Sequence, residues 1–273
     1  MARVAVASVR VSNPDYHVVV IVDEQSAQAM KAADDPLLAE ADQWIAVNTG
    51  LGPAAARSRF VKTSMRQVLD GPFVFLDTDV VVRGSLDDVF GLDADAAGAR
   101  NNSRSKLEEQ YWWEDMAILE KMGWSIGGEA FINSGVLFFA DTVGARRLGE
   151  EWHRRWREEY DRLGQHRDQP GMNSALHALG VRFKLLPDTY NAQFRMNAAV
   201  AWKPLVWHYY ASGSISPETV FGDLVRDLVS GGELDMDRVG EMVRSPHPWR
   251  RRGPLGELGL RLFLQYCQKS GWY

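Results

Sequence analysis

The sequence predicts an α/β protein in which a mostly parallel sheet is flanked by helices and followed by a helical C-terminal appendage. Apolar, β-branched runs alternate with helix-prone stretches through the first half of the chain, an order typical of parallel strands joined by helices. The runs are almost continuously apolar, as expected of strands buried on both faces. A helix-prone tail without comparable runs indicates the appendage.

The first half predicts three strands separated by two helical stretches. Pro36 interrupts the first helical stretch, while the second has Pro53 in its first turn and Gly71 at its end, where these residue types are favoured. The predicted strands are 17–24, 43–50 and 72–82, and the predicted helical stretches are 23–42 and 52–71.

The second half opens with a polar, aromatic segment, residues 101–130, which we expect to lie over the sheet. The simplest partition of the chain is one domain, residues 1–215, with a helical extension, residues 216–273. The elements predicted after residue 130 are strands 131–141, 182–191 and 203–213, helices 142–163 and 169–180, and a helix-rich tail, 217–273.

Composition narrows the classes of function. The chain has 273 residues and a formal net charge of −5, which gives no support for a nucleic-acid partner. Its single cysteine, Cys267, cannot form an internal disulfide, and no apolar run is long enough to cross a bilayer. The first residues lack the pattern of a signal peptide. We therefore expect a cytoplasmic protein.

Two aspartates stand one residue apart in the stretch "FVFLDTDVVV", residues 73–82. Side chains alternate along a strand, so Asp77 and Asp79 point the same way. One interpretation is a strand that meets solvent and turns, with aspartate as a turn residue. The other is a pair of oxygen ligands for a hard cation at the carboxyl edge of a sheet, where open α/β folds place their sites.

Three further motifs are polar groups beside apolar runs, and each has a structural alternative. "FINSGVLFF" carries Asn133, Ser134 and Gly135 and is also compatible with a bulged strand. "DQPGMNSAL" places Asp168 and Gln169 before a helix, where Asp168 is also a natural N-cap. "WHYYASG" contains the residue His208, which is also compatible with a histidine stacked among aromatic neighbours.

The order of five motifs resembles the retaining glycosyltransferases of family 8, which have the GT-A fold. The motifs are "FLDTDVVV", "FINSGVLFF", "DQPGMNSAL", "LLPDTYNAQF" and "WHYYASG". The resemblance covers roughly residues 17–213. It implies a divalent cation, Mn²⁺ or Mg²⁺, and a basic residue in helix 52–71, for which we favour Arg59 over Arg57 and Lys62. By resemblance, the metal ligands are Asp77, Asp79 and His208, the donor-binding residues are Asp77, Asp79, Asn133, Ser134, Gly135, Arg59 and Lys62, and the catalytic residues are Asp168 and Gln169.

The resemblance implies a glycosyltransferase that moves a hexose from a nucleotide sugar, a UDP-sugar above all, to an acceptor hydroxyl with retention. An inverting enzyme would need a carboxylate base, and "WWEDM" offers Glu114 and Asp115 for it, although acidic residues also favour helix starts. The acceptor is open: a glycan, a lipid-linked glycan or a small molecule. Family members shape its pocket in the segment that here contains Trp112, Trp113 and Trp124.

The sequence departs from the family pattern in two places. Family members begin with a strand and a helix before a segment like 13–24, but only some sixteen residues precede the first predicted strand here, and "VAVASVRVSNPD" aligns with the helix. Either the chain starts late or the nucleotide pocket lacks its first wall. The family also often carries a lysine after the late histidine, and "HYYASGSISPETVFG" has none.

Two other functions compete. "FVFLDTDVVV" satisfies the opening motif of haloacid-dehalogenase-type phosphatases, in which the first aspartate is the nucleophile, but that fold begins with this strand. The second is a catalytically inactive protein that only binds nucleotide sugars. The simultaneous presence of six site residues argues against it: Asp77, Asp79, Asn133, Asp168, Gln169 and His208.

The end of the tail combines arginines with an apolar helix. Four arginines precede a stretch from Leu255 to Tyr266 that reads as an amphipathic helix with one polar side. The arginines are Arg244, Arg250, Arg251 and Arg252, and the polar side carries Glu257, Arg261, Gln265 and Gln268. One interpretation is a helix docked on the domain, with a solvated basic loop before it. The other is peripheral contact of residues 244–266 with an anionic membrane surface.

Overall fold

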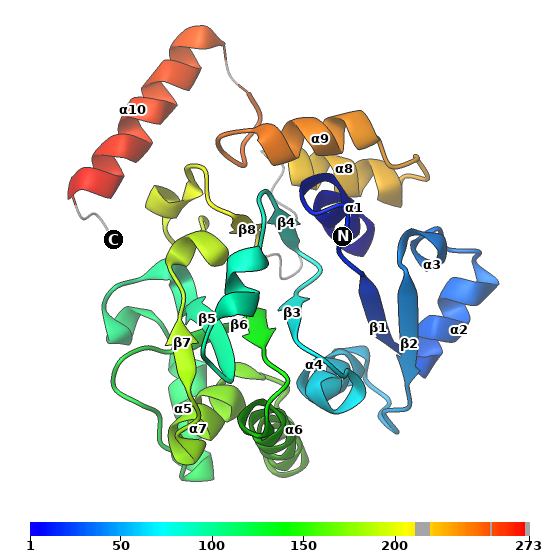
Figure 1. Ribbon diagram of the computed structural model, residues 1–273, viewed down its shortest axis with the longest axis vertical. Coiled ribbons are helices and arrows are strands. Elements are labelled where there is room, and N and C mark those ends of the chain that lie inside the picture. The colour runs from blue at the N-terminus through cyan, green and yellow to red at the C-terminus, as the bar shows by residue number, and fades with distance from the viewer. Residues whose placement is uncertain (211–218, 252, 271–273) are drawn as a thin grey trace.

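The computed structural model describes residues 1–210, 219–251 and 253–270 (Figure 1). Its strands are β1 (Val19–Asp23), β2 (Gln43–Val47), β3 (Phe73–Leu76), β4 (Val80–Val82), β5 (Ala96–Arg100), β6 (Ile132–Phe139), β7 (Phe183–Leu185) and β8 (Val206–His208). The helices are α1 (Ala2–Ser12), α2 (Glu24–Ala32), α3 (Leu37–Glu40), α4 (Ala54–Val68), α5 (Trp113–Met122), α6 (Val143–Leu163), α7 (Gln169–Leu179), α8 (Val220–Val229), α9 (Met236–Arg244) and α10 (Pro254–Ser270).

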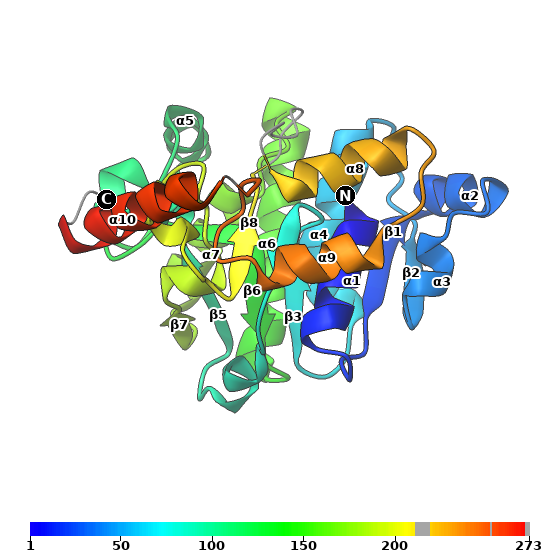
Figure 2. The same ribbon diagram turned by 90° about the horizontal axis from the view of Figure 1, so that it is seen from above.

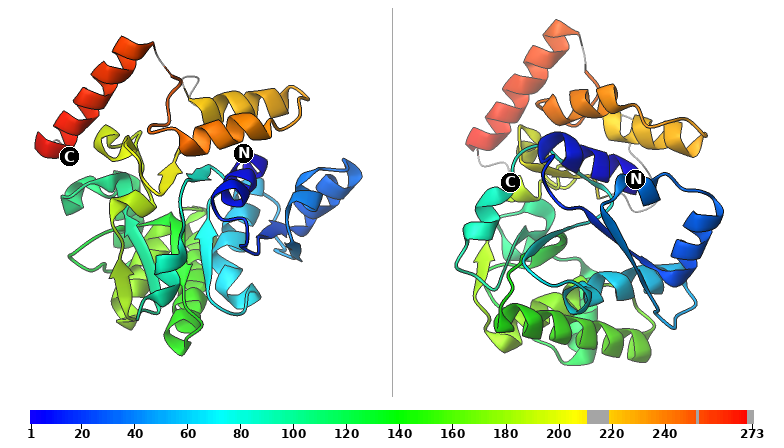
Figure 3. Two further views of the ribbon diagram at one scale, coloured as in Figure 1. Left: turned by 45° about the horizontal axis from the view of Figure 1, so that its top comes forward. Right: turned by 45° about the vertical axis from the view of Figure 1, so that its right-hand side comes forward.

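The strands lie in the middle of the molecule and form three sheets. β1 pairs with β2, β4 pairs with β8, and the largest sheet has the order β3-β6-β5-β7. Helices surround them, with α2 and α3 beside β2 and with α8, α9 and α10 together at one end (Figures 1 and 2). The same arrangement is visible from two further directions in Figure 3.

The predicted α/β fold class is confirmed, and the strand pairing is mixed. β1–β2 and β5–β7 are parallel, as the alternation of strands and helices predicts. β6 runs antiparallel to both of its neighbours, β3 and β5, and β4–β8 is also antiparallel. The antiparallel strand β6 carries the Asn-Ser-Gly motif into the centre of the largest sheet.

Most predicted elements are present, and prolines explain where strands are shorter than expected. The predicted strand 182–191 ends at Leu185, before Pro187, and the strand predicted from residue 203 begins only after Pro204. Proline cannot donate to a strand ladder, so both strands are limited to three residues. Predicted strand 72–82 is two strands, interrupted at Asp77–Asp79.

The tail packs into the body of the molecule through α8 and α9. Phe221, Leu224 and Met242 belong to the same hydrophobic cluster as Val4 of α1 and Trp207 of β8. Burial of these large side chains stabilises the fold by about 2 kcal/mol each. The domain boundary predicted between residues 215 and 216 lies outside the described residues. On its C-terminal side, α8 and α9 share a hydrophobic cluster with α1 and β8 of the predicted first domain.

In the described ranges, no helix is both long and apolar enough to cross a membrane.

Candidate active site

Asp77 and Asp79 lie at the break between β3 and β4, beside the last residue of β8, His208. The antiparallel register that pairs Val80 with His208 brings the imidazole to the aspartates. Nε2 of His208 lies 3.4 Å from Oδ1 of Asp79, and one ligand atom of each of the three residues lies within 4.8 Å of the others. Two carboxylates and an imidazole in this arrangement fit a divalent cation.

Gly135 of β6 leaves the space that this group occupies. A Cβ added there would lie 2.4 Å from Cε1 of His208 and 2.9 Å from Oδ2 of Asp77. The carbonyl of Gly135 also accepts a hydrogen bond from the backbone N–H of Asp77 at 2.8 Å. The position therefore requires the close backbone approach that only glycine allows.

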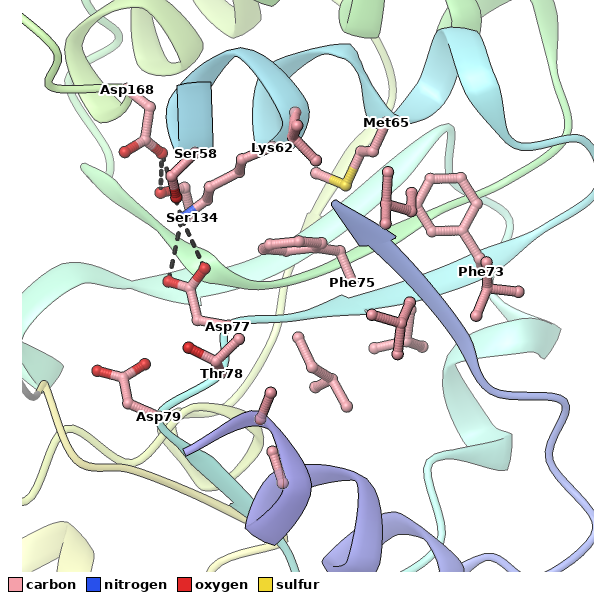
Figure 4. A pocket seen from close by; sticks show the side chains of 18 of the residues that line it. Ser58, Lys62, Met65, Phe73, Phe75, Asp77, Thr78, Asp79, Ser134 and Asp168 are labelled. Atoms are coloured by element: carbon pink, nitrogen blue, oxygen red, sulfur yellow. Dashed lines mark hydrogen bonds and ion pairs between the residues drawn. The ribbon is translucent and has the colours of Figure 1, made fainter. Parts of the chain in front are cut away.

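Lys62 of α4 joins two carboxylates of the site (Figure 4). Its Nζ lies 3.0 Å from Oδ1 of Asp77 and 3.3 Å from Oδ2 of Asp168, and its side chain is 6% exposed. Nε of Arg59, one turn earlier, lies 3.1 Å from Oδ1 of Asp168. Because a buried carboxylate is costly without a partner, these cations make the cluster stable.

Asp168, at the start of α7, is buried and ionised. The hydroxyl of Ser134 donates to its carboxylate at 2.5 Å, and Nε1 of Trp152 donates to its backbone carbonyl at 2.8 Å. Burial raises the pKa of a carboxyl group, but the charges of Lys62 and Arg59 and the bond from Ser134 outweigh it and lower the pKa of Asp168 to about 2. At neutral pH this side chain is an anion and a weak base.

Two amide side chains attach the start of α7 to β6. Oε1 of Gln169 accepts a hydrogen bond from the backbone N–H of Ser134 at 3.2 Å. Asn173, one turn later, bonds both backbone groups of Ile132, at 2.6 and 3.0 Å. Asp168 and Gln169 are therefore held directly beside the Asn-Ser-Gly motif.

Asn133 belongs to a buried network of amides. Its Nδ2 donates to Oδ1 of Asn101 at 2.8 Å and to Oε1 of Gln193 at 3.3 Å. Its Oδ1 accepts from the backbone of Gly135 and from Nδ2 of Asn191, both at 2.8 Å. A side-chain amide has two donor hydrogens and two acceptor positions. All four are used here, so the side chain of Asn133, which also lines the cavity, is held in place by its neighbours.

One cavity of about 1190 Å³ contains the site and extends from it between β1 and β3. Asp77, Asp79, Asp168, Gln169 and His208 line one end of the cavity. The other end is apolar and is lined by the two strands and by α1 and α4. A long cavity with a charged end accommodates a ligand that has one polar and one less polar part.

A second ion pair stands at the rim of the polar end. Nε of Arg167 donates to Oδ1 of the fully buried Asp115 at 2.7 Å, and Oδ2 of Asp115 accepts from the backbone N–H of Trp112 at 2.9 Å. The indole of Trp112 donates in turn to the hydroxyl of Tyr210 at 3.3 Å. Burial raises the pKa of Asp115, opposed by Arg167. Both oxygens of Asp115 therefore accept hydrogen bonds that connect Arg167 to the start of α5.

This geometry agrees with a comparison of the whole chain with known families. The sequence profile of the nucleotide-diphospho-sugar transferases matches residues 14–209. The chain belongs to that family. As a nucleotide-diphospho-sugar transferase it is an enzyme, and the family 8-like GT-A resemblance of its motifs is confirmed. The phosphatase alternative and the inactive binding protein are thereby set aside.

Solved structures of glycosyltransferases share the fold. The galactosyltransferase LgtC, in complex with donor and acceptor sugar analogues, matches with a TM-score of 0.54 at 18% identity, over 94% of each chain. The glycosyltransferase GlyE of Streptococcus pneumoniae TIGR4 matches with a TM-score of 0.53 at 16% identity, over 92% of this chain. The transferase described here spans 63% of GlyE. No curated protein matches the chain.

The three basic residues of α4 contact different carboxylates, and the sequence alone does not show which residue contacts which. Lys62 contacts the first aspartate of the pair, Arg59 contacts Asp168, and Arg57 instead bonds Asp23 at the end of β1, at 2.9 Å. Sequence reasoning missed the amides of the buried network, Asn101, Asn191 and Gln193. Asn191 and Gln193 both stand in the quoted "LLPDTYNAQF" motif, and their place there was the available indication.

Proposed function

We propose that this transferase moves a hexose from a UDP-sugar to an acceptor hydroxyl with retention of the anomeric configuration, and that it needs Mn²⁺ or Mg²⁺. The observation that carries the proposal is the convergence of Asp77, Asp79 and His208 on one point. That point lies beside the buried pair of Lys62 and Asp168, which share the same cavity. Both parts of a nucleotide-sugar reaction, diphosphate binding and sugar positioning, have side chains suited to them here.

The cation would be held by the two aspartates and His208. Carboxylate oxygens suit both ions, and an imidazole favours Mn²⁺. The space that Gly135 leaves open fits this use, since a methyl group there would displace the histidine. When bound, the ion supplies a Lewis acid that neutralises the donor diphosphate and the departing nucleotide.

Arg59 adds a phosphate contact from the protein. It lines the cavity, and its side chain is 40% exposed although one nitrogen is paired with Asp168. A guanidinium group has five N–H donors, so several remain for a phosphate oxygen. The sequence has no lysine shortly after His208 to bind the diphosphate, and Arg59 of α4 can make that contact instead.

Retention is favoured by the scarcity of bases near the site. Asp168 is a weak base because its pKa is about 2, and Asp115 is bonded to Arg167 and Trp112. Gln169 carries no titratable proton and can only orient or stabilise the sugar. In a retaining reaction on one face of the sugar, the departing diphosphate accepts the proton of the acceptor hydroxyl.

Glu114, next to Asp115 in the chain, also lines the cavity, and it supplies the test between retention and inversion. We expect Glu114→Gln to keep most of the activity and the product of an α-linked donor to be an α-glycoside by NMR. A β-linked product, lost when Glu114 is replaced, would show an inverting enzyme with Glu114 as its base.

Removal of a metal ligand tests the function itself. Asp79→Ala should abolish UDP-sugar turnover and metal-dependent UDP binding, and Asp161→Ala, in the exposed part of α6, should leave both unchanged. Turnover is measured with UDP-glucose, UDP-galactose and UDP-N-acetylglucosamine, with and without EDTA. Full turnover by Asp79→Ala, or in EDTA, would refute the proposal.

The three tryptophans expected to shape the acceptor pocket have different surroundings. Trp112 lines the cavity, and Trp113 beside it is 75% exposed. Trp124 lies under the guanidinium of Arg155, 5.3 Å from the ring centroid, and does not line the cavity. We assign the acceptor side to Trp112 and Trp113, whose faces can stack on a sugar ring, and we assign Trp124 to packing.

We also propose that α10 makes peripheral contact with an anionic membrane. Its inner face carries Leu264 and Cys267, which are buried, while Leu255, Leu258, Leu262, Phe263 and Tyr266 on the opposite face are each at least half exposed. Such a stripe of large apolar side chains binds the interfacial region of a bilayer. The basic contribution is smaller than the sequence suggests, because Arg250 bonds Asp223. Arg252 lies outside the described residues.

Vesicle co-sedimentation tests this contact. The protein should sediment with vesicles of phosphatidylglycerol and phosphatidylcholine at low salt, and the double change Leu258→Glu and Leu262→Glu should abolish this. Val143→Glu, at a valine that is 77% exposed on α6, is the matched control. Equal sedimentation of all three proteins would exclude α10 as the contact.

A further inference from the structure

One ion pair joins two segments of the cavity wall. Asp115 lies in the first turn of α5, and Arg167 stands immediately before Asp168 at the start of α7. Nε of Arg167 donates to Oδ1 of Asp115 at 2.7 Å, across 52 positions of the chain. The start of α5, which carries the tryptophans assigned to the acceptor, is thereby attached to the residue next to Asp168.

The guanidinium group of Arg167 has more donors than this bond uses. It carries five N–H groups in a planar fork, and only the one on Nε has a partner among the residues that the structure describes. The side chain of Arg167 is 34% exposed and lines the cavity, whereas that of Asp115 is completely buried. The terminal N–H groups are therefore open to a bound molecule, and the bond to Asp115 restricts the plane in which they lie.

The position of Asp168 is fixed by contacts other than those of Arg167. Its carboxylate is held by the two cations of α4 and by the hydroxyl of Ser134. Its backbone carbonyl accepts a hydrogen bond from Nε1 of Trp152 at 2.8 Å. None of these four contacts involves Arg167. The ion pair of Arg167 with Asp115 therefore has a different role from holding the carboxylate of Asp168.

Aromatic side chains accompany the open donors of Arg167. Trp112 and Tyr210 line the cavity together with Arg167, and the indole of Trp112 donates to the hydroxyl of Tyr210 at 3.3 Å. The backbone N–H of Trp112 donates in turn to Asp115 at 2.9 Å. One bonded series thus runs from Arg167 through Asp115 and Trp112 to Tyr210. Aromatic faces beside hydrogen-bond donors suit a sugar ring, which has apolar faces and hydroxyl groups at its edge.

The positive charge of Arg167 is balanced by its neighbours. Burial lowers the pKa of Arg167, but its hydrogen bond with Asp115 and the charges of Asp115 and Glu114 outweigh burial and raise that pKa. Asp115 and Glu114 both line the cavity, so one cationic group accompanies two carboxyl groups. Electrostatic complementarity therefore disfavours an anionic acceptor here. Neutral hydroxyl groups can accept hydrogen bonds from Arg167 without this repulsion.

We propose that Arg167 determines acceptor specificity, and that its terminal N–H groups bind a hydroxyl group of a neutral glycoside. Asp115 is a positioning residue, because it acts through Arg167 and through the backbone of Trp112. A buried ion pair often adds little net stability, and its use here is to fix the geometry of the acceptor contact. The inference rests on the proposed glycosyl transfer and extends it to the acceptor.

The test compares two reactions of the same enzyme with Mn²⁺ and the three UDP-sugars named above. In hydrolysis water takes the sugar, so this reaction needs no acceptor contact. In transfer the sugar goes to p-nitrophenyl β-glucoside, a neutral probe. Loss of a contact with the acceptor lowers the ratio of transfer to hydrolysis and raises the KM of the glucoside. A merely structural defect lowers both reactions together and leaves their ratio unchanged.

Two variants of Arg167 and one of Asp115 are compared with a matched control. Arg167→Met should lower the ratio by about tenfold or more, as expected for a lost hydrogen bond from a charged group. Arg167→Lys keeps a cation beside the buried Asp115, which protects the fold, but lacks the planar fork and should lower the ratio by a smaller factor. Asp115→Asn should raise the KM of the glucoside and leave that of the donor unchanged. Arg162→Met, at an exposed arginine of α6, should leave the ratio unchanged.

A second probe, p-nitrophenyl β-glucuronide, tests the class of acceptor, because it differs from the glucoside by one carboxylate. The wild type should prefer the glucoside. A preference for the glucuronide that Arg167→Met abolishes would contradict the neutral class and show an anion site. An unchanged ratio in both variants of Arg167, or UDP-sugar hydrolysis without transfer to either probe, would overturn the proposal.

Binding of the glucoside separates this proposal from the proposed function. It is measured by saturation-transfer NMR on the protein with UDP and Mn²⁺, with no reaction required. Absence of turnover with every UDP-sugar would refute the proposed function. In that case, glucoside binding that is lost in Arg167→Met would still support the contact, and equal binding by wild type and variant, or none by the wild type, would overturn it.

Discussion

The two sides of the central cavity differ in the hydrogen-bond pairing and the burial of their strands. On the β6 side, β6 pairs along both edges and is buried at every residue. On the β1 side, β1 pairs along one edge only among the described strands and is partly exposed along most of its length. The candidate catalytic and metal-binding residues are anchored on the β6 side. The reactive groups are thus positioned by a strand that is hydrogen-bonded along both edges, whereas the β1 side forms one wall of the cavity.

The largest expected effect comes from Gly135 on the firm side. Gly135→Ala places a methyl group 2.4 Å from the His208 ring, so the histidine moves and the metal group opens. We expect UDP-sugar turnover to fall by about 10³-fold, equivalent to about 4 kcal/mol. Gly91→Ala, where nothing lies within 4 Å of the added Cβ, is the matched control. Turnover within about threefold of wild type would show that the close approach is not required.

The next effect is on stability, at the lysine that joins the two carboxylates. Lys62→Met leaves Asp77 and the buried Asp168 without their shared partner, and removing one partner of a buried ion pair costs about 3 kcal/mol. Urea denaturation measures the loss, with the exposed Lys184→Met on β7 as control. A change below about 1 kcal/mol would mean that Arg59 alone compensates both carboxylates.

A pH dependence is expected from Glu159, which is fully buried in α6 beneath the site. Burial and the negative charge of Asp168 raise the pKa of Glu159 to about 8. A raised pKa favours the protonated folded state, so stability is highest near and below the ordinary pKa of 4.5 and falls as pH rises towards 8.

The slope contributed by this one group is about 1.4 kcal/mol per pH unit within that window. Glu159→Gln removes the titration, so its stability, measured by urea denaturation from pH 5 to pH 8, should decline less steeply than that of the wild type. Glu150→Gln, at an exposed position of the same helix, should follow the wild-type curve. Identical slopes for wild type and Glu159→Gln would show that Glu159 is already ionised at pH 5.

The smallest effect lies on the loosely paired side. Arg57→Ala removes the ion pair with Asp23, which also accepts from Ser26 at the start of α2. We expect a loss of about 1 kcal/mol in global stability. Hydrogen exchange should accelerate in β1 and β2 and remain unchanged in β6. Equal acceleration in β1 and β6 would show that the two sides of the cavity do not differ in local stability.

The sequence predicted the parts of the molecule that depend on local pattern. The order of strands and helices and the separation of α2 from α3 at Pro36 follow from periodicity and proline. The approach of His208 to the two aspartates was implied by the family resemblance of the motifs. The helix over Ala2–Ser12 was expected from the resemblance, although its alternating valines suit a strand equally well. The segment is a helix in the structure, where it packs against α9 and β4.

The roles of the supporting residues could not be predicted because they depend on partners far away in the chain. Asn191 and Gln193 stand in a quoted motif, yet nothing local shows that they bond Asn133, about sixty residues earlier. Arg57, Arg59 and Lys62 are equally plausible as donor contacts on one helix, and only the positions of Asp23, Asp77 and Asp168 separate their roles. Tertiary structure, not helix spacing, makes this assignment.

The chain of amides behind the site also sets the proton position on His208. The backbone N–H of Gly135 fixes Oδ1 of Asn133 as an acceptor, so Asn191 must present its Nδ2 to Asn133 and its Oδ1 to the imidazole. Nδ1 of His208, 2.8 Å from that oxygen, then carries the hydrogen in the neutral ring. Nε2 keeps its lone pair and faces Asp79. One backbone amide thereby selects the imidazole tautomer two side chains away.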